Sequence, residues 1–258
     1  MKFKVSPSVL TLSVMSCVSF ADDAVGQQPG TNLNAGDIAI VGFNSDGPDE
    51  FAFLLLADVE AGTNISFTDK GWQSSGSLRA NEGIETWTAG SDLSAGTLIN
   101  FPAASFSTTD SGFVLSTSGD QILAYQGSDS SPSFLYAIHF NGAQEFDTSL
   151  EIDSNETTLP TGLTIGSSAV AIGETDNAVF DFSSFGTDQT PDQWRSLISD
   201  PDNWNTTNSD SGFTMPTNSN TTVNVVPSPT AGFGALCLMG LTAARRRRRG
   251  GKALLSSK

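Results

Sequence analysis

Carboxylates are the side chains in this sequence best suited to acid–base chemistry, since the chain has 28 Asp and Glu residues and only one His. Two carboxyl groups held roughly 5–9.5 Å apart hydrolyse glycosidic bonds. Asp58, Asp69, Glu82 and Glu85 are the candidates for such a pair. Charged residues are mostly exposed in folded proteins, so we favour solvated surface acids as the interpretation of these four residues.

Residues 44–50, NSDGPDE, concentrate oxygen donors around a glycine. Hard cations such as Ca²⁺ bind carboxylate and carbonyl oxygens, so Asp46, Asp49 and Glu50 are weak candidates for calcium ligands. Their spacing does not match an EF-hand loop, and Pro48 is foreign to that loop. A polar hairpin turn is the favoured interpretation, because Asn, Asp, Gly and Pro are the ordinary residues of turns.

Few other reactive groups are present. His139 lies in an alternating run typical of a strand and no GxSxG motif accompanies it, so a structural role is favoured over a catalytic triad. Cys17 and Cys237 lie near the two ends of the chain, which leaves the body without a thiolate site. We therefore predict that the protein is not an enzyme and needs no cofactor, with calcium as the open alternative.

Aromatic side chains offer a second kind of recognition. Four tryptophans and seventeen phenylalanines could present a stacking face to a polysaccharide; the tryptophans are Trp72, Trp87, Trp194 and Trp204. Aromatic residues of a β-sandwich more often fill its core. Core packing is the favoured interpretation, and sugar binding stays open as the alternative.

The elements that must position these residues are mostly strands. Short apolar or alternating runs are separated by Gly, Asn, Asp, Ser and Pro, which predicts an all-β fold of the β-sandwich type. The expected strands are residues 37–43, 50–58, 64–68, 85–88, 97–101, 112–115, 121–126, 133–140, 163–165, 169–172 and 178–182. One short helix is expected at 191–198, with Pro and Asp in its first turn. The sandwich domain is placed at 22–204, and the Asn-, Thr- and Ser-rich residues 205–225 are predicted to form a flexible polar spacer.

Charge is distributed very unevenly. The formal net charge is -16, and only Lys70, Arg79 and Arg195 are basic between the two ends of the chain. A body with so few cations cannot neutralise phosphates. Nucleic acid is therefore excluded as a partner.

The first residues have the pattern of a secretory signal peptide. Lys2 and Lys4 precede an apolar run, and small residues lead to a predicted signal-peptidase cleavage between Ala21 and Asp22, so that residues 1–21 are removed. A buried N-terminal helix is a less favoured alternative. Lipidation of Cys17 is another, because residues 14–17 loosely resemble a lipoprotein box.

The last residues predict a single C-terminal transmembrane helix. An apolar run within 226–249 ends in five arginines, Arg245, Arg246, Arg247, Arg248 and Arg249. Extended back to 225, the run has roughly the 20 residues that span a bilayer. The arginines would hold residues 250–258 in the cytoplasm.

The motif Val226-Pro227-Ser228-Pro229, followed by an apolar helix and an Arg cluster, resembles the PEP-CTERM sorting signal of Gram-negative bacteria, in a VPSP form. The resemblance implies that an exosortase recognises this motif and removes the tail, so that the protein reaches the cell surface or the exopolysaccharide matrix. The family's usual glutamate between the prolines is Ser228 here. A plain membrane anchor is the alternative.

The body, from about residue 36 to 204, resembles an uncharacterised secreted bacterial domain related in style to lamin-tail or immunoglobulin-like sandwiches. The resemblance rests on residues 36–72, on RANEGIETWTA and on LSTSGDQILAYQG. It implies no activity. We therefore expect an exported, non-enzymatic surface or matrix protein with a structural or adhesion role. A polysaccharide- or calcium-binding module is the alternative, and a glycoside hydrolase a distant one.

Overall fold

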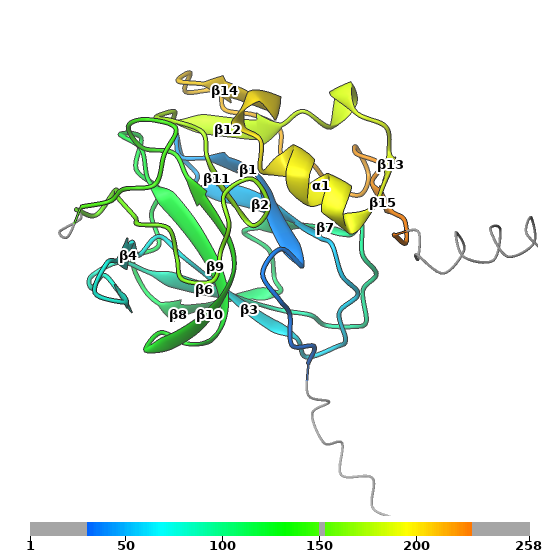
Figure 1. Ribbon diagram of the computed structural model, residues 1–258, viewed down its shortest axis with the longest axis horizontal. Coiled ribbons are helices and arrows are strands. Elements are labelled where there is room, and N and C mark those ends of the chain that lie inside the picture. Colours follow the sequence, from blue (N-terminus) through cyan, green and yellow to red (C-terminus); the bar gives the residue numbers. More distant parts are fainter. Residues whose placement is uncertain (1–29, 150–152, 229–258) are drawn as a thin grey trace, which may run out of the picture.

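Two sheets make up most of the computed structural model, which describes residues 30–149 and 153–228 (Figure 1). The five-stranded sheet has the order β14 (Trp204–Thr207), β12 (Asn177–Phe180), β1 (Ile38–Asn44), β2 (Glu50–Leu55) and β7 (Leu98–Phe101). The six-stranded sheet has the order β11 (Ala169–Ala171), β10 (Ser131–His139), β9 (Gln121–Ser128), β3 (Asn64–Thr68), β6 (Ile84–Thr88) and β8 (Phe106–Asp110). All neighbouring strands are antiparallel except β10 and β11. The expectation of an all-β protein is confirmed.

The remaining elements are short. Two-stranded ladders join β4 (Trp72–Gln73) to β5 (Ser77–Leu78), and β13 (Asp188–Gln189) in parallel to β15 (Asn224–Val225). The helices are η1 (Phe182–Ser184), α1 (Pro191–Ile198) and η2 (Pro201–Asn203). Helix α1 has the predicted bounds because Thr190 and Gln193 form a capping box around Pro191.

Aromatic side chains join the two sheets face to face. Phe51 and Phe53 of β2 each place their ring centroid 4.8 Å from that of Phe67 in β3. Phe43 of β1 stacks on Phe140, just beyond β10, at 3.8 Å. This core dominates the stability of the domain, because each buried aromatic ring removes a large apolar area from water.

Strand β1 is buried along its whole length. One face of β1 packs against β10 of the six-stranded sheet. Helix α1 also contacts β1, and its residues Trp194 and Ile198 are buried. A second apolar cluster lies on the outer face of the six-stranded sheet. It joins Trp72 to Leu123, Tyr125 and Phe134.

Two of the expected strands are absent from the described residues. Residues 112–115 pair with no strand, because the backbone N–H groups of 114–116 donate to the carboxylates of Asp69, Asp49 and Asp120 instead. Residues 163 and 164 lie between two turns without regular structure, and Ile165 forms a single bridge with Ala169. The edge strand β8 was not predicted, since its polar sequence FSTTD lacks an apolar alternation.

The predicted flexible spacer at 205–225 is wrong. It contributes most of β14 and all of β15, and it buries Met215 against the core. The side chain of Asn218 accepts from the backbone N–H of Leu98 at 2.8 Å and donates to its carbonyl at 3.0 Å, which blocks the free edge of β7. The Asn218 amide, one of the polar groups on which the prediction of a solvated linker rested, therefore forms hydrogen bonds with the backbone of the domain.

No helix within the described residues is long and apolar enough to cross a membrane. The predicted transmembrane helix lies almost wholly in residues 229–258, outside the part of the chain that the structure describes.

Candidate functional site

An open groove of about 620 Å³ lies at the end of the five-stranded sheet near β12 and β14. Its aromatic lining comes from the segment FDFSSF, which begins at Phe180, the last residue of β12. Phe180 is buried, and its ring stacks on Phe185 with centroids 5.5 Å apart, while Phe182 meets it edge-on at 4.8 Å. Phe182 and Phe185 are only half-buried, so part of each ring remains accessible from the groove.

Besides Val179 and Pro216, most of the remaining lining consists of uncharged polar groups. Asn205 of β14 contributes an exposed amide, and the other hydroxyl and amide groups come from Ser183, Thr187, Thr214, Asn220, Thr221 and Thr222. Asp181 is the one charged residue of the lining. Its carboxylate accepts from the hydroxyls of Ser183 at 2.5 Å and Ser184 at 2.6 Å, and these bonds lower its pKa; it also caps η1 by accepting from the Ser183 N–H at 3.0 Å.

One wall of the groove is made by residues 214–222, from the segment expected to be a spacer. Besides the bonds of Asn218 to Leu98, the side chain of Asn100 donates to the carbonyl of Pro216 at 3.1 Å. The groove therefore exists because this segment is packed on the domain. Sequence reasoning missed it for that reason; the only local signal was the pair of phenylalanines flanked by Asp and Ser.

The four tryptophans do not line this groove. Trp72, Trp87, Trp194 and Trp204 are all at most 8% exposed, which confirms the prediction that they belong to the core. Any stacking of sugars at the groove would use phenylalanine rings instead.

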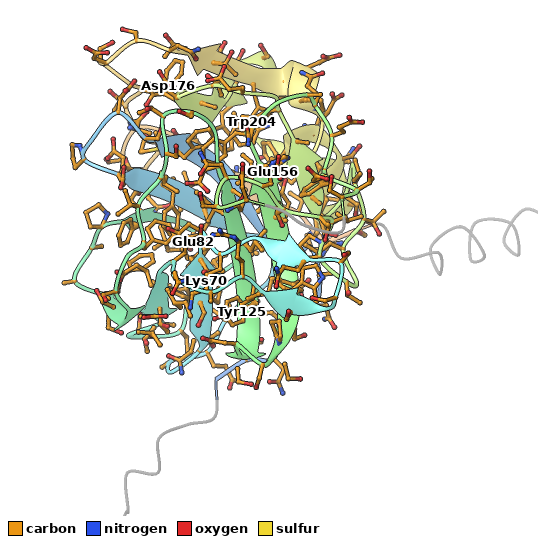
Figure 2. The ribbon with its side chains drawn as sticks, turned by 90° about the vertical axis from the view of Figure 1, so that its left-hand side faces the viewer. Lys70, Glu82, Tyr125, Glu156, Asp176 and Trp204 are labelled. Atoms are coloured by element: carbon orange, nitrogen blue, oxygen red, sulfur yellow. The ribbon has the colours of Figure 1, made fainter. Side chains whose placement is uncertain are left out.

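The interpretation of the four hydrolase candidates as solvated surface acids is wrong for Asp69 and Glu85, which are 2% and 8% exposed; Asp58 is exposed and Glu82 is half-buried. Asp58 accepts from the N–H of Ala95 at 2.9 Å, and Glu85 accepts from the hydroxyl of Thr108 at 2.8 Å. Asp69 and Glu82 do come together, where β3 ends and its neighbour β6 begins. Glu82 also lies near Lys70 there (Figure 2).

Asp69 and Glu82 belong to a cluster of buried carboxyl groups that also includes Asp120. Burial raises the pKa of Asp69 to about 6, of Glu82 to about 7 and of Asp120 to about 8, and repulsion from Asp69 adds to the last two shifts. Both oxygens of Asp69 accept backbone N–H groups, from Gly83 at 2.8 Å and Val114 at 2.9 Å.

This cluster holds a loop in place. The N–H groups of residues 114–116 donate in succession to Asp69, Asp49 and Asp120, each on a different segment. The loop can approach this closely only over Gly83, where an added Cβ would lie 1.8 Å from the backbone nitrogen of Phe113. The arrangement is a structural tether in which the oxygens of Asp69 and Asp120 accept backbone N–H groups, while Oε2 of Glu82 is buried without a partner among the described residues.

The calcium candidates are not brought together. Asp46 accepts from Asn177 at 2.9 Å, Asp49 accepts from the Leu115 N–H at 3.1 Å, and Glu50 accepts from Asn44 at 2.6 Å. Within residues 30–149 and 153–228, no three His, Cys, Asp or Glu side chains are placed to hold a metal ion. The polar-turn interpretation of residues 44–50 fits these contacts.

His139 is buried at the end of β10, where its ring stacks on Phe146 with centroids 5.6 Å apart. Burial lowers its pKa. In the sorting motif, Val226 donates its N–H to the carbonyl of Gln189 at 2.9 Å, and Pro227 and Ser228 are exposed. Pro229, the Arg245–Arg249 cluster, Cys17, Ala21 and Asp22 lie outside the described residues.

Comparison of the chain with protein-family models, with curated proteins and with solved structures found no match. The function is therefore argued from the geometry of the groove and from the sequence.

Proposed function

We propose that this chain is an exported surface or extracellular-matrix protein with a non-enzymatic adhesion role, and that its groove binds neutral polysaccharide. The observation that carries the binding proposal is the combination of two half-buried rings, Phe182 and Phe185, with a lining of hydroxyl and amide groups. Ligand sites typically combine apolar walls with a few orienting polar groups, in volumes of roughly 300–1,000 Å³. Sugars fit this combination, because their C–H faces pack on rings and their hydroxyls pair with amides.

The charge of the groove and of the surrounding domain favours uncharged over anionic polysaccharides. No basic residue lines the groove, and the surrounding domain is strongly acidic. An anionic polysaccharide would be repelled by this field. The ligand we favour is therefore an uncharged, hydroxyl-rich chain of the exopolysaccharide matrix.

The proposal of a non-enzymatic role rests on the same lining. Glycoside hydrolysis needs two carboxyl groups beside the scissile bond. The groove has Asp181 alone, and its oxygens are engaged in capping η1.

Export and sorting are supported by the sequence. We infer cleavage by signal peptidase after Ala21, recognition of residues 226–229 by an exosortase, and an inner-membrane precursor held by the transmembrane helix within residues 226–249. We further infer that the two packed sheets belong to the lamin-tail or immunoglobulin-like style of sandwich, as the resemblance of the body implies.

Affinity electrophoresis through gels that contain a neutral β-glucan, a galactomannan or anionic alginate tests the groove. We expect retardation by a neutral polysaccharide alone, and its loss in Asn205→Ala. Thr206→Ala is the matched control, since Thr206 is exposed on the same strand but does not line the groove. Equal retardation of the two variants, or retardation by alginate alone, would overturn the binding proposal.

Intact-mass analysis of the protein from fractions of its native host tests export and sorting. We expect a species that begins at Asp22 and ends near Val226, in the matrix or at the outer surface. A mass that retains Arg245–Arg249 in the inner membrane contradicts exosortase processing. A lipid on Cys17 contradicts the assigned cleavage.

A further inference from the structure

Asn141 and Gly142 line a second cavity, of about 180 Å³, beside the end of β10, and this cavity shares no lining residue with the groove. They form the one Asn-Gly sequence of the chain. Asn141 is half-buried and Gly142 is exposed, so solvent reaches the backbone at this point.

An Asn-Gly sequence has a reaction of its own. The backbone nitrogen of the second residue attacks the side-chain carbonyl carbon of Asn, and a five-membered succinimide ring forms as the side-chain nitrogen leaves as ammonia. Water then opens the ring at either of its two carbonyl groups, which gives aspartate or isoaspartate. Glycine favours ring closure because it has no Cβ to hinder the approach of its nitrogen.

The nitrogen of Gly142 is available as the nucleophile. Its N–H forms no hydrogen bond with any residue of the described chain, whereas its carbonyl accepts from the N–H of Glu174 at 3.1 Å. The residue has a φ of +60°, and no atom lies within 4 Å of the position that a Cβ would occupy. The structure therefore holds Gly142 at its carbonyl and leaves its nitrogen unpaired.

The leaving group is restrained by one contact. Nδ2 of Asn141 donates to the backbone carbonyl of Asn155 at 2.8 Å, and this is the only hydrogen bond that the side chain makes within the described residues. To turn its carbonyl carbon toward the Gly142 nitrogen, the side chain must give up this bond. A neutral hydrogen bond is worth about 1 kcal/mol net, so the fold should slow the reaction about two- to tenfold relative to a free peptide.

No side chain supplies the base for the reaction. His139 lines the cavity, but its Nε2 atom is buried and has no partner among the described residues, so it does not contact the Gly142 N–H. Solvent hydroxide must take the proton. The carboxylates of Glu145, Asp147 and Glu156, the last labelled in Figure 2, also line the cavity and disfavour loss of a proton beside them. Salt screens this effect.

Three loops meet at Asn141. The side chain of Asn155, whose carbonyl Asn141 contacts, donates to the hydroxyl of Ser116 at 2.9 Å. Gly119 lies so close that an added Cβ would be 2.7 Å from the Cα of Asn141. Conversion of Asn141 would replace the Nδ2 donor by a carboxylate oxygen facing the carbonyl of Asn155, and isoaspartate would also lengthen the backbone by one carbon.

We propose that Asn141 is a self-modification site. The nitrogen of Gly142 displaces ammonia from the Asn141 side chain, and water opens the resulting succinimide to a mixture of aspartate and isoaspartate. Water is the only other reactant consumed, and no group is oxidised or reduced. The product loosens the junction with the loop that contains Asn155. This site is independent of the proposed groove.

Peptide mapping by mass spectrometry of the full chain, kept folded at pH 8.5 in concentrated NaCl, tests the reaction. We expect aspartate and isoaspartate at position 141, formed no more than about tenfold slower than in the synthetic peptide IHFNGAQ. Asn208, exposed and followed by Ser209, is the internal control and should stay unconverted over the same period. No product at 141 once the peptide has reacted fully, equal conversion at 208, or aspartate without isoaspartate would overturn the proposal.

Two variants test the ring closure and its consequence. Asn141→Gln should abolish the conversion at 141, because its ring would need six members; unchanged conversion would contradict the succinimide route. Asn141→Asp carries the product's charge and should speed hydrogen exchange in residues 153–157. Asn208→Asp adds the same charge at an exposed position and should leave that exchange unchanged. Equal exchange in these two aspartate variants would contradict the loosened junction.

Discussion

Raising the pH from about 4 to 8 should lower the free energy of unfolding of this protein, because three buried carboxyl groups have raised pKa values. A carboxyl group whose pKa is higher in the folded state binds its proton more tightly there than in the unfolded chain. Its contribution to stability is greatest while it is protonated, and is lost as the pH rises through the folded pKa. For Asp69, Glu82 and Asp120 these values are about 6, 7 and 8.

A lower bound on the change in the free energy of unfolding comes from Asp69, whose pKa shift is the smallest of the three. The pKa of Asp69 rises from 3.8 to about 6, and the residue is 2% exposed. One pKa unit corresponds to about 1.4 kcal/mol, so this group alone changes the free energy of unfolding by roughly 3 kcal/mol. Glu82 and Asp120 extend the decline to higher pH. Two lowered pKa values act in the opposite sense: that of Asp110 only in more acidic solution, and that of His139 below about pH 6.5, where it offsets part of the decline.

Urea unfolding of the full chain, followed by the fluorescence of its buried tryptophans from pH 4.5 to 8.5, measures this dependence. Asp69→Asn should make the free energy of unfolding less dependent on pH, because an amide does not titrate. It should also lower the free energy of unfolding at every pH, since an amide cannot accept from both Gly83 and Val114. Asp210→Asn removes the same charge at an exposed position and should keep the slope. A stability that is constant or rises between pH 5 and 8 would refute protonation of the cluster.

Three other substitutions test the packing. Phe51→Ala should lower the free energy of unfolding by about 3–5 kcal/mol in urea titrations, since its ring contacts four other phenylalanines of the core. Tyr136→Phe should cost about 1 kcal/mol, because it deletes a buried 2.9 Å hydrogen bond to Ser199; an unchanged midpoint contradicts that bond. Asn218→Ala should cost about 1–2 kcal/mol and speed limited proteolysis after residue 213. A true spacer would show neither effect.

Much of the fold was predictable because it depends on local periodicity. The alternating or continuous apolar runs at 64–68, 121–126 and 133–140 predict β3, β9 and β10, whose side chains meet the core in a regular pattern. Helix α1 was predicted to the residue, since Thr190, Pro191 and Gln193 are a local start signal. The burial of the tryptophans followed from their size and apolar surface.

The candidate site was less predictable, because its residues meet only through long-range contacts. The acids Asp46, Asp49 and Glu50 are neighbours in the chain, yet each bonds to a different segment. Asp69 and Asp120 are far apart in the sequence and become neighbours beneath one loop. The imidazole of His139 was correctly expected in a strand, but only the surrounding loops reveal its unpaired nitrogen.

By itself, the sequence determined the all-β class, most of the strands, the helix and the acidic character of the body, because these depend on nearest-neighbour pattern and composition. It also carries the signals for export and sorting, which remain predictions. Tertiary structure alone decided that residues 205–225 belong to the domain, since Asn218 finds its partner, Leu98, on a distant strand. The groove has the same origin. Its walls come from segments whose polar sequence resembles a linker until the backbone groups of the sheet become their hydrogen-bond partners.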